Sequence, residues 1–146
     1  MKLEVFVLVI EKQNIFLNQT PDTKENVIRR IGAVFSERGY TDESYTQAML
    51  DKEKVFNTYM GNFVALPHGI EEAKKDIKKT GIVIMTFPEG QDWGAKELAK
   101  VVIGIAAVGN EHLEVLSKIA LSFSDAKGIE RLLSMSEEEI CAMFEG

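Results

Sequence analysis

The chain alternates between short runs of consecutive apolar residues and stretches in which apolar residues recur every three or four positions, as on one face of a helix. Residues 81–87 and 101–108 are apolar at nearly every position, which is typical of strands covered on both faces. The run Phe63 to Leu66 ends at Pro67-His68-Gly69, where proline stops ladder pairing and glycine permits a turn. A shorter run, Ile15 to Leu17, predicts a small buried strand.

The stretches between these runs have the apolar spacing of helices. The segment Thr20 to Thr23 holds two possible N-cap residues and a proline suited to a first turn. After it, one helical face carries Val27, Ile28, Ile31, Val34 and Phe35, and Gly39 can end this helix. Thr41 can cap a second helix, and Lys52 then lies near its end. Pro88 is expected at an element boundary, because proline punctuates local structure.

Two further helices follow the last apolar run. Asn110 can cap the first of them and places His112 in its opening turn. The second opens with Ser136 to Glu139, which is a capping-box pattern. Strands and helices therefore alternate along the chain. This order predicts an α/β fold, with a mixed, partly parallel β-sheet of about five strands sandwiched between α-helices.

Length and composition narrow the class of protein. The chain has 146 residues and 45% hydrophobic positions, which predicts one domain over residues 1–146. Its net charge of −6 disfavours nucleic acid as a partner. We expect no direct membrane insertion, because the apolar runs fall short of the roughly 20 residues that a membrane span needs. The single cysteine, Cys141, fits a reducing compartment, so the expected location is cytoplasmic.

Both histidines follow directly on an apolar run. Ligand sites in α/β folds lie at the carboxyl ends of strands, so His68 and His112 are the candidate site residues. A neutral imidazole is a nucleophile, and most imidazoles are neutral at pH 7. His112, in the first turn of a helix, suits hydrogen bonding to an anion. The alternative is that each histidine is an ordinary surface residue or a satisfied hydrogen-bonding group.

The sequence lacks the motifs that would indicate several other kinds of site. The chain shows no spacing typical of a zinc site, no phosphate-binding or dinucleotide-binding glycine motif and no nucleophile elbow, so we expect no metal and no cofactor. Cys141 lies among apolar residues at helical spacing and is expected to be buried. The pairs Lys74-Lys75 and Lys78-Lys79 are best interpreted as a solvated helix or loop.

Taken together, several segments resemble the enzyme IIA proteins of the bacterial sugar phosphotransferase system, and more narrowly their mannitol branch. The strongest are Gln47 to Lys54, Tyr59 to Gly69, and Val102 to Ala107 with Asn110 to His112. Ile15 to Leu17, Thr80-Gly81 and Phe87 to Gly90 also match, so the resemblance runs from about residue 14 almost to the end.

The resemblance implies a function for each candidate residue. His68 would accept a phosphoryl group at Nε2 from phosphorylated HPr, as a phosphohistidine intermediate. It would pass the group to a cysteine of the mannitol IIB domain, so the partners would be HPr and the mannitol IIB and IIC permease components. His112 would stabilise the phosphoryl group. Lys52 stands where the family commonly has arginine; it keeps the positive charge but lacks the planar fork that grips phosphate at two points.

The sequence leaves three alternatives to a mannitol phosphotransferase component open. The chain could be a regulatory, nitrogen-related paralogue or a fructose-type enzyme IIA, although the Asn110-Glu111-His112 context favours mannitol. It could instead be a non-enzymatic module in which the histidines line an anion pocket. The last alternative predicts reversible phosphate binding without a covalent product.

Overall fold

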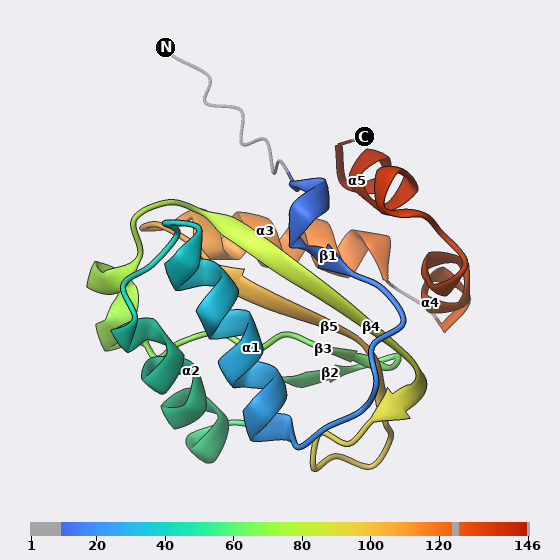
Figure 1. The fold of residues 1–146 in the computed structure, drawn as a ribbon, viewed down its shortest axis with the longest axis horizontal. Helices are drawn as coiled ribbons and strands as arrows, with labels where there is room; N and C mark the ends of the chain where they lie inside the picture. Colours follow the sequence, from blue (N-terminus) through green and yellow to red (C-terminus); the bar gives the residue numbers. More distant parts are fainter. Residues whose placement is uncertain (1–9, 124–125, 146) are drawn as a thin grey trace.

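The computed structural model describes residues 10–123 and 126–145 (Figure 1). In chain order its elements are η1 (Lys12–Asn14), β1 (Ile15–Phe16), α1 (Lys24–Glu37), α2 (Ser44–Val55), β2 (Tyr59–Gly61), β3 (Val64–Ala65), η2 (Glu71–Asp76), β4 (Gly81–Gln91), β5 (Ala99–Ala106), α3 (Glu111–Ser122), α4 (Ala126–Leu133) and α5 (Glu137–Glu145). The elements labelled η are 3-10 helices. In this part of the chain, no helix combines the length and the apolar composition that crossing a membrane requires.

The five strands form one mixed sheet in the order β1-β4-β5-β3-β2. The long strands β4 and β5 are antiparallel at its centre. β1 runs parallel to β4, and β3 runs parallel to β5, while β2 adds an antiparallel edge. The prediction of a partly parallel sheet of about five strands, with the two apolar runs at its centre, is therefore confirmed.

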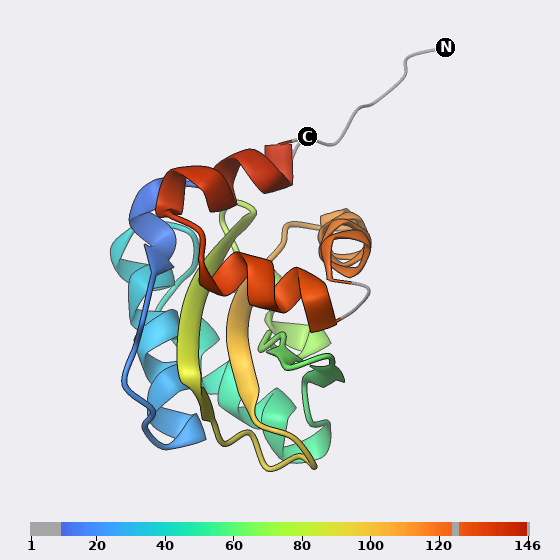
Figure 2. The same ribbon diagram turned by 90° about the vertical axis from the view of Figure 1, so that its right-hand side faces the viewer.

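Helices cover both faces of the sheet (Figures 1 and 2). Successive side chains of a strand point to opposite faces, and β4 shows the result. Ile82 and Ile84 pack in a core with buried residues of α3, α4 and α5, whereas Val83 and Met85 pack in a second core with α1 and α2. A central strand that is buried on both faces needs an apolar residue at every position, which explains the continuous runs in the sequence.

Two of the predicted helix starts are confirmed in detail. The Thr23 hydroxyl accepts a hydrogen bond from the Asn26 backbone N–H at 3.1 Å, at the start of α1. At the start of α5, the Glu139 N–H donates to the Ser136 hydroxyl, and the Ser136 N–H donates to the Glu139 carboxylate. These reciprocal bonds form the expected capping box.

The other two predicted caps are wrong in detail. Thr41 forms a β-bridge with Ile77, and its hydroxyl donates to the Asp42 carbonyl, so α2 begins later, at Ser44, without a side-chain cap. Asn110 does precede α3, but its side chain makes no capping hydrogen bond. In both cases the position of the helix follows from packing of its apolar face, which outweighs the cap.

The sheet also differs from the prediction in its details. β4 continues past Pro88 to Gln91, with an irregular register after Thr86, so proline lies inside this strand and not at its boundary. An irregularity in the ladder accommodates a residue that has no N–H to donate. The pattern of apolar residues did not predict β2, η2 or α4.

Candidate functional site

His68 lies just beyond the carboxyl end of β3, beside the central strand β5. It forms an isolated parallel bridge with Ile105, whose N–H donates to the Pro67 carbonyl at 2.9 Å. The His68 Nδ1 lies 2.7 Å from the Leu66 carbonyl oxygen. A carbonyl can only accept, so Nδ1 carries the proton and donates. The other ring nitrogen, Nε2, therefore carries the free electron pair and is the nucleophilic atom of the ring.

Gly69 and Tyr45 fix the backbone next to this histidine. The Gly69 N–H donates to the Tyr45 hydroxyl at 2.9 Å, and that hydroxyl donates to the Ile105 carbonyl at 2.8 Å. A Cβ atom at position 69 would lie 2.5 Å from the Tyr45 ring, so only glycine allows this approach. Burial raises the pKa of Tyr45 to about 12, which keeps the hydroxyl protonated as a donor.

His112 reaches the same place from the first turn of α3. The centroids of the His68 and His112 rings are 5.0 Å apart and the rings are tilted by 53°. The two histidines are separated by 44 positions in the sequence, and the carboxyl ends of β3 and β5 bring them together as predicted. The imidazoles can therefore act on one ligand.

Lys52 lies in the last turn of α2, as predicted, and lines the same cavity as the two histidines. The side chain of the next residue, Glu53, is only 6% exposed and holds this end of the helix in place. Its carboxylate accepts hydrogen bonds from the Thr58 N–H and hydroxyl and from the Trp93 indole, and pairs with Lys24 at 2.7 Å. A buried carboxylate with all these partners is costly to displace, so Glu53 fixes the backbone that carries Lys52.

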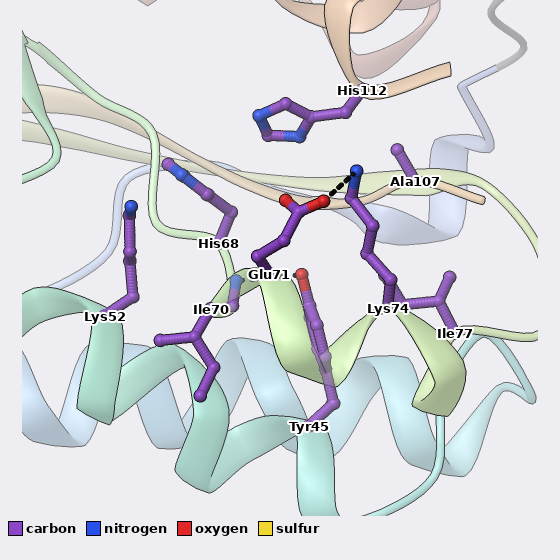
Figure 3. A pocket seen from close by; sticks show the side chains of 10 residues that line it. Tyr45, Lys52, His68, Ile70, Glu71, Lys74, Ile77, Ala107 and His112 are labelled. Atoms are coloured by element: carbon purple, nitrogen blue, oxygen red, sulfur yellow. Dashed lines mark hydrogen bonds and ion pairs between the residues drawn. The ribbon is translucent and has the colours of Figure 1, made fainter. Parts of the chain in front are cut away.

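These side chains surround a cavity of about 120 Å³ (Figure 3). A water molecule takes roughly 30 Å³ of liquid, so an anion the size of a phosphoryl group fits inside. The ten lining residues are Tyr45, Lys52, His68, Gly69, Ile70, Glu71, Lys74, Ile77, Ala107 and His112. Among residues 10–123 and 126–145, no three histidine, cysteine or acidic side chains lie together as potential metal ligands. The cavity is lined by two imidazoles, two ammonium groups and one carboxylate, so the balance of charge suits an anion.

Sequence reasoning missed Glu71 and Lys74 as cavity residues. The basic run predicts a solvated segment, and Lys75, Lys78 and Lys79 are indeed exposed. Lys74, however, lies on η2 at the cavity wall and is half-buried. A signal was present in the spacing of Glu71 and Lys74, which places the two side chains on one side of a helical turn. Cys141, expected to be buried, is only partly buried: it packs against the core, its thiol lies 3.2 Å from the Ile10 carbonyl, and it does not line the cavity.

Both histidines are biased toward the neutral form. Burial lowers the pKa of His68 below its ordinary value, and the Lys52 charge lowers it further, against the opposing effect of the hydrogen bond to Leu66. Burial likewise lowers the pKa of His112, and the charges of His68 and Lys74 add to this. A protonated imidazole has no free electron pair, so this bias keeps Nε2 of His68 nucleophilic.

The pKa shifts predict how His68 titrates. Because the folded environment disfavours the imidazolium, we expect its NMR titration midpoint to lie below the ordinary value of 6.5. His68 then stays competent as a nucleophile as the pH falls through 6.5 and loses competence only at lower pH. Imidazole resonances followed between about pH 4.5 and 8 measure this directly. A His68 midpoint at or above 6.5 would contradict the described environment of the ring.

Comparisons with known proteins agree on one family. The sequence matches the family model described as "Phosphoenolpyruvate-dependent sugar phosphotransferase system, EIIA 2" over residues 8–146. It is 47% identical to the mannitol-specific phosphotransferase enzyme IIA component of Bacillus subtilis over 137 residues, which are 93% of this chain and 96% of that protein. It is 41% identical to the protein of the same name from Geobacillus stearothermophilus, over 93% of this chain and 94% of the relative.

Solved structures give the same picture. The enzyme IIAMTL chain in its complex with phosphorylated enzyme IIBMTL from Escherichia coli superposes with a TM-score of 0.88 at 39% identity, covering 94% of this chain and 98% of that one. The crystal structure of IIA mannitol from Escherichia coli gives 0.84 at 41% identity, over 92% and 98% of the two chains. The nitrogen regulatory protein IIA-Ntr from Neisseria meningitidis gives 0.80 at 24% identity, over 93% and 96%, which shows a shared fold alone.

Proposed function

Because the chain belongs to the EIIA 2 family of the phosphoenolpyruvate-dependent sugar phosphotransferase system, we propose that it carries phosphoryl groups for mannitol uptake. In this proposal His68 accepts the group from phosphorylated HPr and passes it to the cysteine of the mannitol IIB domain. The observation that carries it is the hydrogen bond from His68 Nδ1 to the Leu66 carbonyl, which leaves Nε2 free in a cavity of cationic and imidazole groups.

The acceptance step follows from this geometry. The electron pair on His68 Nε2 forms a bond to phosphorus, while the N–P bond of the HPr phosphohistidine breaks and its electron pair returns to the HPr imidazole. Nδ1 keeps its proton and its bond to Leu66, so the Leu66 carbonyl stabilises the positive charge that develops on the ring. Onward transfer reverses the roles, since the N–P bond at His68 breaks and an S–P bond to the IIB cysteine forms.

Positioning and charge supply the rest of the chemistry. Phosphoryl transfer spreads negative charge over three equatorial oxygens, and preorganised donors aimed at them lower the barrier. Lys52 provides a positive charge and His112 provides a ring N–H, both in the cavity that contains His68. No step in this scheme requires a metal or a nucleotide.

The relatives that are 40–47% identical are named as mannitol-specific components, which favours mannitol over the regulatory and fructose-type alternatives. We propose that the protein acts in the cytoplasm, where HPr and the IIB domain would meet it. The test is transfer from the purified phosphoprotein to mannitol IIB, with fructose IIB as the control acceptor. Transfer to neither acceptor, after normal acceptance from HPr, would refute the transport role and favour the regulatory one.

His112 is expected to contribute less than His68 but in a specific way. Replacing it with alanine removes a hydrogen bond to a charged group, so onward transfer to IIB should slow roughly tenfold while acceptance from HPr persists. Single-turnover rates in the two directions measure this. Unchanged onward transfer in His112→Ala would remove His112 from the proposed site.

A further inference from the structure

Glu71 and Lys74 place an ion pair on the wall of the proposed phosphoryl site. Both side chains come from η2 and point into the cavity (Figure 3). The Lys74 Nζ lies 2.9 Å from the Glu71 carboxylate, and their side chains are 36% and 78% exposed. Nothing in the fold requires this pair, because exposed pairs contribute little to stability.

The Glu71 carboxylate interacts with the positive charges around the cavity. The hydrogen bond and charge of Lys74 lower the pKa of Glu71, and the charges of His112 and Lys52 lower it further. The same Lys74 and Lys52 charges act on His112. The Glu71 carboxylate therefore lies within the field of every cationic group that the described cavity offers, and it is the one acidic side chain lining that cavity.

A phosphoryl group on His68 would compete directly with this carboxylate. The group adds nearly two negative charges to the cavity at neutral pH, and the Glu71 carboxylate would repel it. Lys74 would interact more strongly with the phosphoryl oxygens than with one carboxylate. Glu71 is mostly exposed, so its side chain can turn out to solvent without loss of packing.

We propose that Glu71 is an internal counter-anion that holds Lys74 at the cavity wall in the unphosphorylated protein, and that Lys74 exchanges it for the phosphoryl group on His68. This inference rests on the proposed function of His68. Lys74 becomes a second phosphoryl-binding cation beside Lys52. Glu71 sets a limit on how tightly the group is held, because each acceptance must displace the carboxylate and each onward transfer restores it. A carrier that must release its group to IIB benefits from such a competitor.

The chain offers matched controls for the test. Glu72 and Lys75 lie on the same 3-10 helix, carry the same charges and are exposed, but neither lines the cavity. The measurement is the equilibrium constant for phosphoryl exchange with HPr, obtained by quenching mixtures of phospho-HPr and protein and quantifying both phosphoproteins by intact mass. The variants are Glu71→Gln, Lys74→Gln and their double mutant, compared with Glu72→Gln and Lys75→Gln.

Relative to wild type, Glu71→Gln should shift this equilibrium toward the phosphorylated protein by at least about threefold. Lys74→Gln should shift it by a similar factor in the opposite direction, toward phospho-HPr. The loss of Lys74 should have a larger effect when Glu71 is already glutamine, because Lys74 is then unpaired before transfer. If Glu71→Gln and Glu72→Gln behave alike, the inference is wrong while the function of His68 stands. If the wild-type protein accepts no phosphoryl group from HPr, the proposed function fails, and the inference fails with it.

Discussion

His68→Ala is expected to abolish phosphorylation by phospho-HPr. The substitution removes the Nε2 atom that forms the bond to phosphorus, and the other cavity imidazole, on His112, comes from a different element and lacks the Leu66 contact that fixes the His68 tautomer. The expected result is no measurable transfer, because covalent carriage has no substitute for its nucleophile. Incubation with enzyme I, HPr and phosphoenolpyruvate, followed by intact-mass analysis, measures it.

Trp93 provides the control for folding in this experiment. It is the only tryptophan, it is fully buried, it does not line the cavity, and its indole donates to Glu53 and Thr58. Native tryptophan fluorescence in the inactive variant shows that the fold is intact. A phosphorylated His68→Ala protein, with an acid-labile gain of one phosphoryl group, would mean that another residue is the acceptor.

Lys52→Ala is expected to give the second largest effect. Its ammonium group is the charge on the His68 side of the cavity, and removing one preorganised donor from a transferring group typically costs about 10²- to 10³-fold in rate. Lys52→Arg should stay within about tenfold of wild type, because the charge is kept and a planar fork is added. Quenched-flow rates of transfer from phospho-HPr distinguish the two variants.

The neighbouring Lys54 is the matched control for Lys52. It lies in the same helical turn, its side chain is 73% exposed, and it does not line the cavity. Lys54→Ala should therefore transfer at the wild-type rate. If Lys52→Ala and Lys54→Ala give equal rates, Lys52 acts only as a surface charge.

The central sheet and the meeting of the histidines could be predicted from the sequence because both depend on local patterns. Continuous apolar runs determine β4 and β5, and a residue that directly follows a strand must lie at its carboxyl end. His68 lies shortly after β3, and His112 lies in the first turn of α3, the helix that follows β5, so both reach the carboxyl ends of these parallel strands. Lys52 follows from helical spacing in α2. The resemblance to the enzyme IIA family then added a chemical function that the spacing alone left open.

The remaining features depend on tertiary contacts that a sequence pattern does not encode. Thr41 is a good cap by type, but its bridge to Ile77 draws it away from the helix start. The spacing of Glu71 and Lys74 indicates that their side chains share one side of a helical turn, but only the path of η2 beside the cavity makes that side face the site. The tautomer of His68 depends on the carbonyl of Leu66. Every residue has such a backbone carbonyl, so the sequence carries no signal for this contact.

Nitrogen NMR of the phosphorylated protein tests the central claim most directly. With only two histidines in the chain, labelling histidine with ¹⁵N gives two resolvable imidazoles. We predict phosphorus coupling at Nε2 of His68, a retained proton at Nδ1 of the same ring, and an unmodified His112 ring. Phosphorus coupling at His112, at Nδ1 of His68, or at neither ring would contradict the account.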